Sequence, residues 1–244
     1  MHSVLVYHTI SSPPEPLPAN IDVAPDRFAT HLAWLARNRQ VASLEQVLAT
    51  PASKRLVSIT FDDGFRDNLT VALPLLEYFK MPCAVFVTAD FIGKEGYLSP
   101  TELKDLAAHP LVTIGAHGFS HGHFTEMTKE EARHELVTAR YCLEDLTEKR
   151  VDLHAWPFGS CNAGLERLSL ECGYRAAWTV WRGANRQHSL WRVPLGRNDD
   201  LLRFVAKISQ FYFPLKKAVR GQSAEVDSQF GVSGPPVAPT LRLP

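Results

Sequence analysis

The chain contains 244 residues, a length at which one α/β barrel or one large sheet domain can bury a full core. Its 26 basic and 26 acidic side chains cancel, which argues against nucleic acid or an anionic membrane as a partner and favours a neutral or small substrate. No apolar stretch reaches the roughly 18 residues of a membrane-spanning helix, and the N-terminus lacks the basic region and cleavage site of a signal peptide, so we expect a cytoplasmic protein.

Apolar runs typical of buried strands alternate with helical patterns along the chain. Strands are expected at residues 3–7, 56–60, 83–88, 112–115, 153–156 and 176–180. Helices are expected around Phe28 to Leu35, over residues 68–80, after Ser99, over residues 132–146 and over residues 163–172. Capping boxes, in which Ser99 pairs with Glu102 and Thr128 with Glu131, mark the starts of two of these helices. The alternation predicts βα units around a parallel sheet.

Two adjacent carboxylates, Asp62 and Asp63, follow the strand expected at residues 56–60. In a βα barrel, this edge of the sheet carries the active site. Adjacent carboxylates repel each other, so their presence needs an explanation. A cation bound by one of them would reduce the repulsion and leave the other free as a base. The alternative is a turn in which Asp-Gly serves the backbone geometry and one aspartate caps the following helix.

His117 and His121 lie four residues apart, directly after the strand expected at residues 112–115. One helical turn at this spacing could direct both imidazoles at a single ion. Neutral imidazole suits zinc, our first choice, as well as cobalt, nickel or manganese. His123 is a rival ligand, although its spacing from His117 fits one helical face less well. Together with one aspartate, two histidines would hold a metal ion and leave positions open for water and substrate, as in catalytic sites.

The sequence Thr-Phe-Asp-Asp-Gly at residues 60–64 resembles the first motif of the polysaccharide deacetylases, and residues 117–121 resemble their second motif. This resemblance implies the following roles: Asp62 as the catalytic base, and Asp63, His117 and His121 as ligands of one divalent metal ion. It also implies a distorted (β/α) barrel of about seven parallel strands, as in the NodB homology domain. We expect this domain to span residues 1–221 and residues 222–244 to form a disordered tail.

Residues 155–159, Ala-Trp-Pro-Phe-Gly, resemble the third motif of the family, in which a backbone amide helps to bind the oxyanion. By this resemblance, the donor is the N–H of Phe158. Trp156 and Pro157 adjoin it and are expected among the substrate-binding residues. Trp156 is the first candidate for stacking against a sugar, because an aromatic ring offers a large amphipathic area at low entropy cost.

The third motif departs from the family pattern because the arginine with which many members begin it is absent. Arg192 or Arg197 is the candidate to replace it in orienting Asp62. We place Arg192 with the residues that bind the oxyanion and the substrate.

The N-terminal Val-Tyr-His at residues 6–8 is similar to a Tyr-His element in the branch of the family that includes poly-N-acetylglucosamine deacetylases. In that branch, the N-terminal histidine is thought to be the general acid, so His8 is the candidate here. The alternative is a core histidine at the end of a strand.

These residues predict a metal-dependent hydrolase that removes N-acetyl groups from an N-acetylated sugar, polysaccharide or glycan precursor and releases acetate. One alternative is an O-acetyl esterase or small-molecule amidase that uses the same site. Another is a catalytically silent carbohydrate-binding domain that holds a metal, which the missing arginine motivates. The presence of Asp62 argues against the silent domain, because a binding module has no evident need for a base beside a ligand carboxylate.

Overall fold

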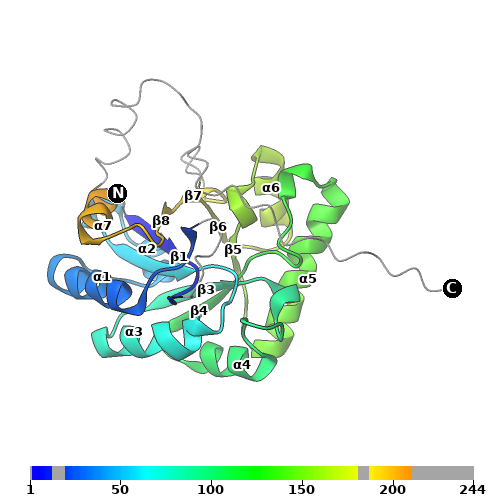
Figure 1. Cartoon of the computed structure of the whole chain (residues 1–244). Coiled ribbons are helices and arrows are strands. Elements are labelled where there is room, and N and C mark those ends of the chain that lie inside the picture. Colours follow the sequence, from blue (N-terminus) through cyan, green and yellow to red (C-terminus); the bar gives the residue numbers. More distant parts are fainter. Residues whose placement is uncertain (1, 13–19, 181–186, 210–244) are drawn as a thin grey trace.

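Eight parallel strands form one sheet in the order β7-β6-β5-β4-β3-β2-β1-β8, with helices around its outside (Figure 1). The computed structural model describes residues 2–12, 20–180 and 187–209. The strands are β1 (Ser3–Tyr7), β2 (Val57–Phe61), β3 (Cys83–Val87), β4 (Val112–Ala116), β5 (Leu153–Ala155), β6 (Ala176–Thr179), β7 (Leu190–Trp191) and β8 (Val193–Pro194). The predicted parallel α/β barrel is therefore confirmed.

A single residue, Arg192, separates the two edge strands of this sheet. β7 pairs with β6 and β8 pairs with β1, so one extended segment connects the two edges and nearly closes the barrel. The amide of Arg192 still donates to the carbonyl of Thr179 at 2.9 Å, whereas the amide of Leu195 donates to the carbonyl of Val6 at 2.9 Å. Eight strands are present instead of about seven because this closing segment counts as two.

Side chains at local capping positions start several helices. Both predicted capping boxes are present, at Ser99 before α4 and at Thr128 before α5, and Asn162 caps α6. The α-helices are α1 (Pro25–Asn38), α2 (Leu44–Ala49), α3 (Leu73–Phe79), α4 (Pro100–Ala108), α5 (Lys129–Thr147), α6 (Ala163–Glu171) and α7 (Leu201–Ile208). A π-helical turn, η3 (Asn68–Ala72), precedes α3, and the short 3₁₀ turns are η2 (Ala52–Lys54), η4 (Ala89–Phe91), η5 (Phe124–Glu126) and η6 (Pro157–Gly159). The sequence patterns did not predict α2 and α7.

Strand residues alternate between a layer under the helices and the barrel interior. On β3, Val85 packs in the outer apolar cluster and Phe86 in the inner one. Phe86 fits inside because Gly115 of the neighbouring strand has no side chain: a Cβ there would lie 2.5 Å from Phe86 Cδ1. The ring of Trp178 lies 5.6 Å from that of Phe86 and fills the inner cluster further. This packed interior surrounds the few polar side chains that point inward.

No helix in the part of the chain that the structure describes is both long and apolar enough to cross a membrane. The disordered tail predicted at residues 222–244 lies outside the described residues. The single domain predicted over residues 1–221 stays a prediction.

A buried histidine, His31 on α1, links three elements of the fold. Its Nε2 donates to the carbonyl of Asp199 at 2.9 Å, and its Nδ1 accepts from the hydroxyl of Tyr7 at 3.1 Å. Its ring stacks on that of Phe204 of α7 with centroids 4.0 Å apart. Burial lowers the pKa of His31 to about 4, although the Asp199 carbonyl opposes this shift. The native fold therefore contains a neutral imidazole with both nitrogens bonded.

We expect the free energy of unfolding to fall as the pH is lowered from about 6.5 toward 4, partly because of His31. In this window the unfolded chain binds a proton at His31 and the folded protein does not, so acid favours unfolding. The contribution is at most about 1.4 kcal/mol per pH unit. Urea denaturation at several pH values should show a shallower pH dependence for His31→Gln than for the wild type. An equal dependence in both proteins would contradict this role.

Candidate active site

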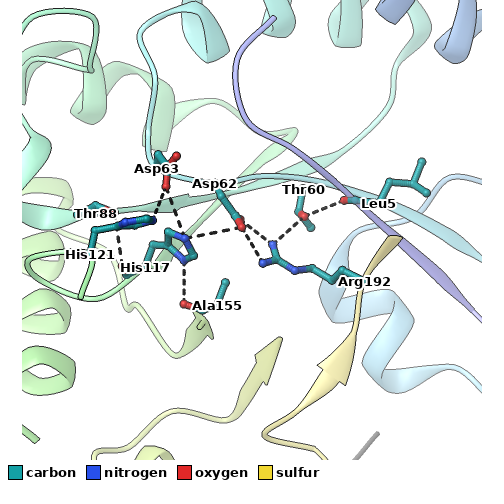
Figure 2. Close-up of polar contacts among 9 residues, drawn as sticks. All are labelled: Leu5, Thr60, Asp62, Asp63, Thr88, His117, His121, Ala155 and Arg192. Carbon is teal, nitrogen blue, oxygen red and sulfur yellow. Dashed lines mark hydrogen bonds and ion pairs between the residues drawn. The ribbon is translucent and has the colours of Figure 1, made fainter. Parts of the chain in front are cut away.

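The twin aspartates and the paired histidines converge at the carboxyl edge of the sheet (Figure 2). Asp62 and Asp63 directly follow β2, and His117 directly follows β4, which lies two strands away in the sheet. Because all strands are parallel, their carboxyl ends meet at one edge. His121 returns to the same place at the end of the loop after β4. The structure thus brings together two segments that are more than 50 residues apart in the sequence.

Three side chains surround a common point. Oδ1 of Asp63 lies 3.0 Å from Nε2 of His121 and 3.5 Å from Nε2 of His117. One ligand atom from each residue lies within 4.8 Å of the others. Ligands of a tetrahedral zinc ion are about 3.3 Å apart, given bonds of about 2.0 Å. Asp63 Oδ1 is buried, and although it lies near both imidazoles, it accepts no hydrogen bond of good geometry from the described residues, so a cation would satisfy it. The geometry and the donor set therefore fit a divalent metal ion.

Protonation of the two histidines bears on metal binding. Nδ1 of His117 donates to the carbonyl of Ala155 at 2.8 Å, which leaves Nε2 directed at Asp63. Burial lowers the pKa of His117 to about 4, so its imidazole is neutral near neutral pH. Burial would also lower the pKa of His121, but the charge and close contact of Asp63, together with the charges of Asp62 and Glu135, raise it. A metal ion at this site would therefore compete with a proton for His121.

Asp62 lies beside this cluster and is held by an arginine (Figure 2). Its two carboxylate oxygens accept from Nη1 and Nη2 of Arg192 at 2.6 and 2.7 Å. Nη1 also donates to the hydroxyl of Thr60 at 3.2 Å, and the side chains of Asp62 and Arg192 are 4% and 0% exposed. Burial would raise the pKa of Asp62, but the charge of Arg192, with smaller contributions from His117, His8 and the Arg192 hydrogen bonds, holds it below the ordinary value. Asp62 is thus an ionised carboxylate 3.8 Å from Nε2 of His117.

The two candidate replacements for the missing arginine have different partners. Arg192 pairs with Asp62, whereas Nε of Arg197 donates to the Asp22 carboxylate at 2.8 Å. The prediction that Arg192 binds the oxyanion or substrate is corrected, because its side chain is fully buried and its two Nη atoms point to Asp62. The local motif could not identify it, since it lies 130 residues after Asp62.

The third-motif segment, η6, places one of its predicted residues beside the cluster and buries two. The ring of Phe158 lies 4.6 Å from that of His121 and stacks on that of His123 at 3.9 Å. Trp156 and Pro157 are buried, and Nε1 of Trp156 donates to the carbonyl of His188. A ring without exposed surface cannot stack against a sugar, so the substrate-binding roles predicted for Trp156 and Pro157 are corrected to packing. His123 stacks on Phe158 and is not part of the metal-binding cluster.

His8 lies next to the twin aspartates. It directly follows β1, and the amide of Asp62 donates to the carbonyl of the preceding residue, Tyr7, at 2.9 Å. The side-chain amide of Asn68 donates to the carbonyl of His8 at 2.8 Å and fixes its backbone. Nδ1 of His8 is buried without a hydrogen-bond partner among the residues that the structure describes. The imidazole of His8 is thus close enough to interact electrostatically with both carboxylates.

Aromatic rings that the sequence patterns did not single out border the cluster. The ring of Phe91 lies 5.7 Å from that of His121 and 4.7 Å from that of Tyr97. Tyr97 in turn stacks on Phe65 with centroids 4.8 Å apart. Burial raises the pKa of Tyr97 to about 12, and the nearby Asp63 carboxylate adds to the shift. These half-buried rings, rather than Trp156, are the apolar surface beside the aspartates.

A buried glutamate on α5 also belongs to the site, and the sequence patterns missed it. Oε2 of Glu135 accepts from the amides of Phe119 and Ser120, both at 2.8 Å, in the loop between the two histidines. A signal was present in the sequence: Glu135 falls on the core-facing stripe of its helix, between Ala132 and Ala139. A charged residue at such a position requires a buried partner.

Comparison with known proteins links these residues to relatives. The family model described as polysaccharide deacetylase matches residues 49–177, more than half of the chain. The Bacillus subtilis protein YxkH, whose name assigns it to the polysaccharide deacetylases, is 26% identical over 187 residues, 74% of this chain and 65% of YxkH. The poly-beta-1,6-N-acetyl-D-glucosamine N-deacetylase of Escherichia coli K12 is 24% identical over 228 residues, 72% of this chain but only 34% of that enzyme.

The fold has close counterparts as well. The crystal structure of a polysaccharide deacetylase from Bacillus cereus superposes with a TM-score of 0.76 at 22% identity, covering 84% of this chain and 68% of that one. The segment matched by the family model contains the aspartates and both histidines of the cluster, whereas His8 and Arg192 lie outside it.

Proposed function

Because this chain belongs to the polysaccharide deacetylase family, we propose that it removes N-acetyl groups from an N-acetylated carbohydrate and releases acetate. The reaction uses one divalent metal ion, and zinc is the first candidate. The observation that carries this proposal is the ionised Asp62 beside the cluster of Asp63, His117 and His121 but outside it. The Escherichia coli relative is named for its action on poly-beta-1,6-N-acetyl-D-glucosamine. A glycan that contains N-acetylglucosamine is therefore the first substrate to test.

Hydrolysis of an acetamide requires an activated water, a stabilised oxyanion and a proton for the departing amine. A metal ion held by Asp63, His117 and His121 would supply a bound water of lowered pKa and a positive charge near the oxyanion. The remaining requirements fall to the side chains and backbone around the cluster.

Asp62 is the proposed base, which takes the proton of the water as that water attacks the acetyl carbonyl. Arg192 supports this role, because two hydrogen bonds fix the carboxylate and its charge keeps the carboxylate ionised. The backbone N–H of Phe158 is the proposed oxyanion donor. His8 is the proposed acid, which donates its proton to the nitrogen as the C–N bond breaks. Acetate and a free amino sugar result.

The test combines metal analysis of the purified protein with an acetate-release screen over short acetylated saccharides. We expect about one zinc ion per chain and release of acetate from N-acetylated oligosaccharides, with both lost in His117→Ala. Release from O-acetylated xylan instead would favour an esterase. Sugar binding without any acetate release would favour the silent binding domain and overturn the proposal.

Replacing His8 with alanine is expected to lower turnover roughly a hundredfold or more, the usual contribution of a general acid. Zinc content should stay at the wild-type level, because His8 is not in the metal-binding cluster. The measurement is the pH dependence of kcat in both proteins. If the alkaline limb of the profile is unchanged in His8→Ala, His8 is not the acid.

A further inference from the structure

The loop that carries the two histidines has a conformation that its own residues do not favour. Gly118 has φ of +74°, which glycine adopts easily, but His121 itself has φ of +63°. The left-handed conformation costs an L-residue with a Cβ about 1–2 kcal/mol. In this conformation of the loop, Nε2 of His121 lies 3.0 Å from Oδ1 of Asp63, so contacts with other groups must offset its cost.

Two sets of hydrogen bonds hold the loop from opposite sides. On one side, the carbonyls of Gly118 and Phe119 accept from the amides of Ala89 and Asp90 in η4, at 3.3 and 2.9 Å. On the other side, the amides of Phe119 and Ser120 donate to the carboxylate of Glu135. The loop is thus fixed immediately before His121.

Glu135 is well suited to this task. Both 2.8 Å bonds reach the same oxygen, Oε2, and hydrogen bonds to an ionised acceptor are roughly twice as strong as neutral ones. The residue is 8% exposed, so water competes little for these bonds. A Cβ added at Gly118 would lie only 3.3 Å from Oε2, which shows how closely the loop packs on the carboxylate.

We propose that Glu135 is a positioning residue that sets the metal affinity of the site by fixing the direction of His121. This inference rests on the proposed function only in taking Asp63, His117 and His121 as the metal ligands. Glu135 acts mainly through the geometry of the loop, because Oε2 accepts from two backbone amides of the loop. Its charge also acts on His121, as the last of the five causes that shift the pKa of that histidine. Partners of this kind, which orient a ligand, typically contribute 10–100-fold to metal affinity.

Two conservative variants separate geometry from charge. Glu135→Gln keeps an oxygen at the position of Oε2 and loses the charge, with its NH₂ group in the place of Oε1. Glu135→Asp keeps the charge but withdraws the oxygen by about 1.5 Å, one carbon–carbon bond. Zinc dissociation constants of the apo proteins are measured by competition with a chelating indicator, after circular dichroism confirms that each variant is folded.

We expect Glu135→Asp to weaken zinc binding about 10–100-fold and Glu135→Gln to weaken it less. The opposite order, or an affinity of Glu135→Asp within about twofold of the wild type, overturns the proposal. If Glu135→Asp does not fold, Glu135→Ala, which removes both the oxygen and the charge, takes its place. It should weaken zinc binding about 10–100-fold, more than Glu135→Gln does, and an affinity within about twofold of the wild type overturns the proposal.

Two controls locate the cause of any change. Glu130→Gln removes the same charge from an exposed position on the same helix and should bind zinc as the wild type does. His117→Ala should lose zinc binding. If His117→Ala binds zinc normally, the metal site itself is wrong, and the proposed function fails with it. If only the Glu135 variants behave normally, the metal site stands and the role of Glu135 is refuted.

Discussion

Asp62→Asn is expected to lower acetate release by about 10²–10⁴-fold, the range by which a positioned general base contributes to catalysis. An amide cannot take the proton of the attacking water, although its oxygen can still accept one hydrogen bond from Arg192. Zinc content should be retained, because Asp62 lies outside the cluster of ligand atoms. The measurement pairs initial rates of acetate release with elemental analysis of the same preparation.

The neighbouring residue provides a matched control. Asp63→Asn is the same chemical change one position later, and it should lose zinc together with activity because Asp63 supplies the ligand oxygen. If Asp62→Asn retains normal turnover, or if it loses zinc as Asp63→Asn does, the division of roles between the two aspartates is wrong.

Arg192→Met is expected to destabilise the folded protein by about 3–5 kcal/mol, the cost of leaving one partner of a buried ion pair alone. The destabilisation should be largest near neutral pH. The pKa of Asp62 is lowered in the folded protein, so the pair stabilises the fold above about pH 3.9, the ordinary value for an aspartate. Below that pH, protonation removes the contribution. Urea denaturation of wild type and variant at about pH 7 and about pH 3 measures this convergence.

The same change should alter the pH dependence of catalysis. Without the guanidinium, burial raises the pKa of Asp62, so the base is protonated at higher pH and the acidic limb of the kcat profile moves upward. Arg192→Lys keeps the charge but loses the bidentate geometry. It replaces Arg192→Met in this measurement if the methionine variant does not fold. Arg197→Met removes the guanidinium that pairs with Asp22 and should leave the limb in place. If Arg197→Met shifts the acidic limb of the kcat profile and Arg192→Met does not, Arg197 is the arginine that controls Asp62, and the assignment to Arg192 is wrong.

Local patterns predicted most of the fold because the forces behind them act over a few residues. The apolar runs at β1, β2, β3, β5 and β6 are buried on both sides, and the last three residues of β4 are buried as well. The capping boxes of α4 and α5 involve side chains three residues apart. The missed elements are short. β7 and β8 have two residues each, and α2 has six, too few for a period to stand out.

The predictions for aromatic residues failed for a different reason. Trp156 adjoins the third motif in the sequence, but the strand before it directs its ring into the core, where its N–H bonds to His188. Phe91 and Tyr97, which carry no motif, lie beside His121 because the loop after β3 folds across the same edge of the sheet. Sequence adjacency therefore did not identify the rings that border the site.

By itself, the sequence determined the parallel α/β class and the identity of the twin aspartate and paired histidines, because periodicity, caps and ligand spacing are local properties. Only the tertiary structure decided that Arg192 holds Asp62 and that Glu135 holds the histidine loop. The first contact joins residues 130 positions apart and the second joins a loop to the helix that follows it, 15 and 16 positions on. The energy of both depends on burial that no local segment possesses.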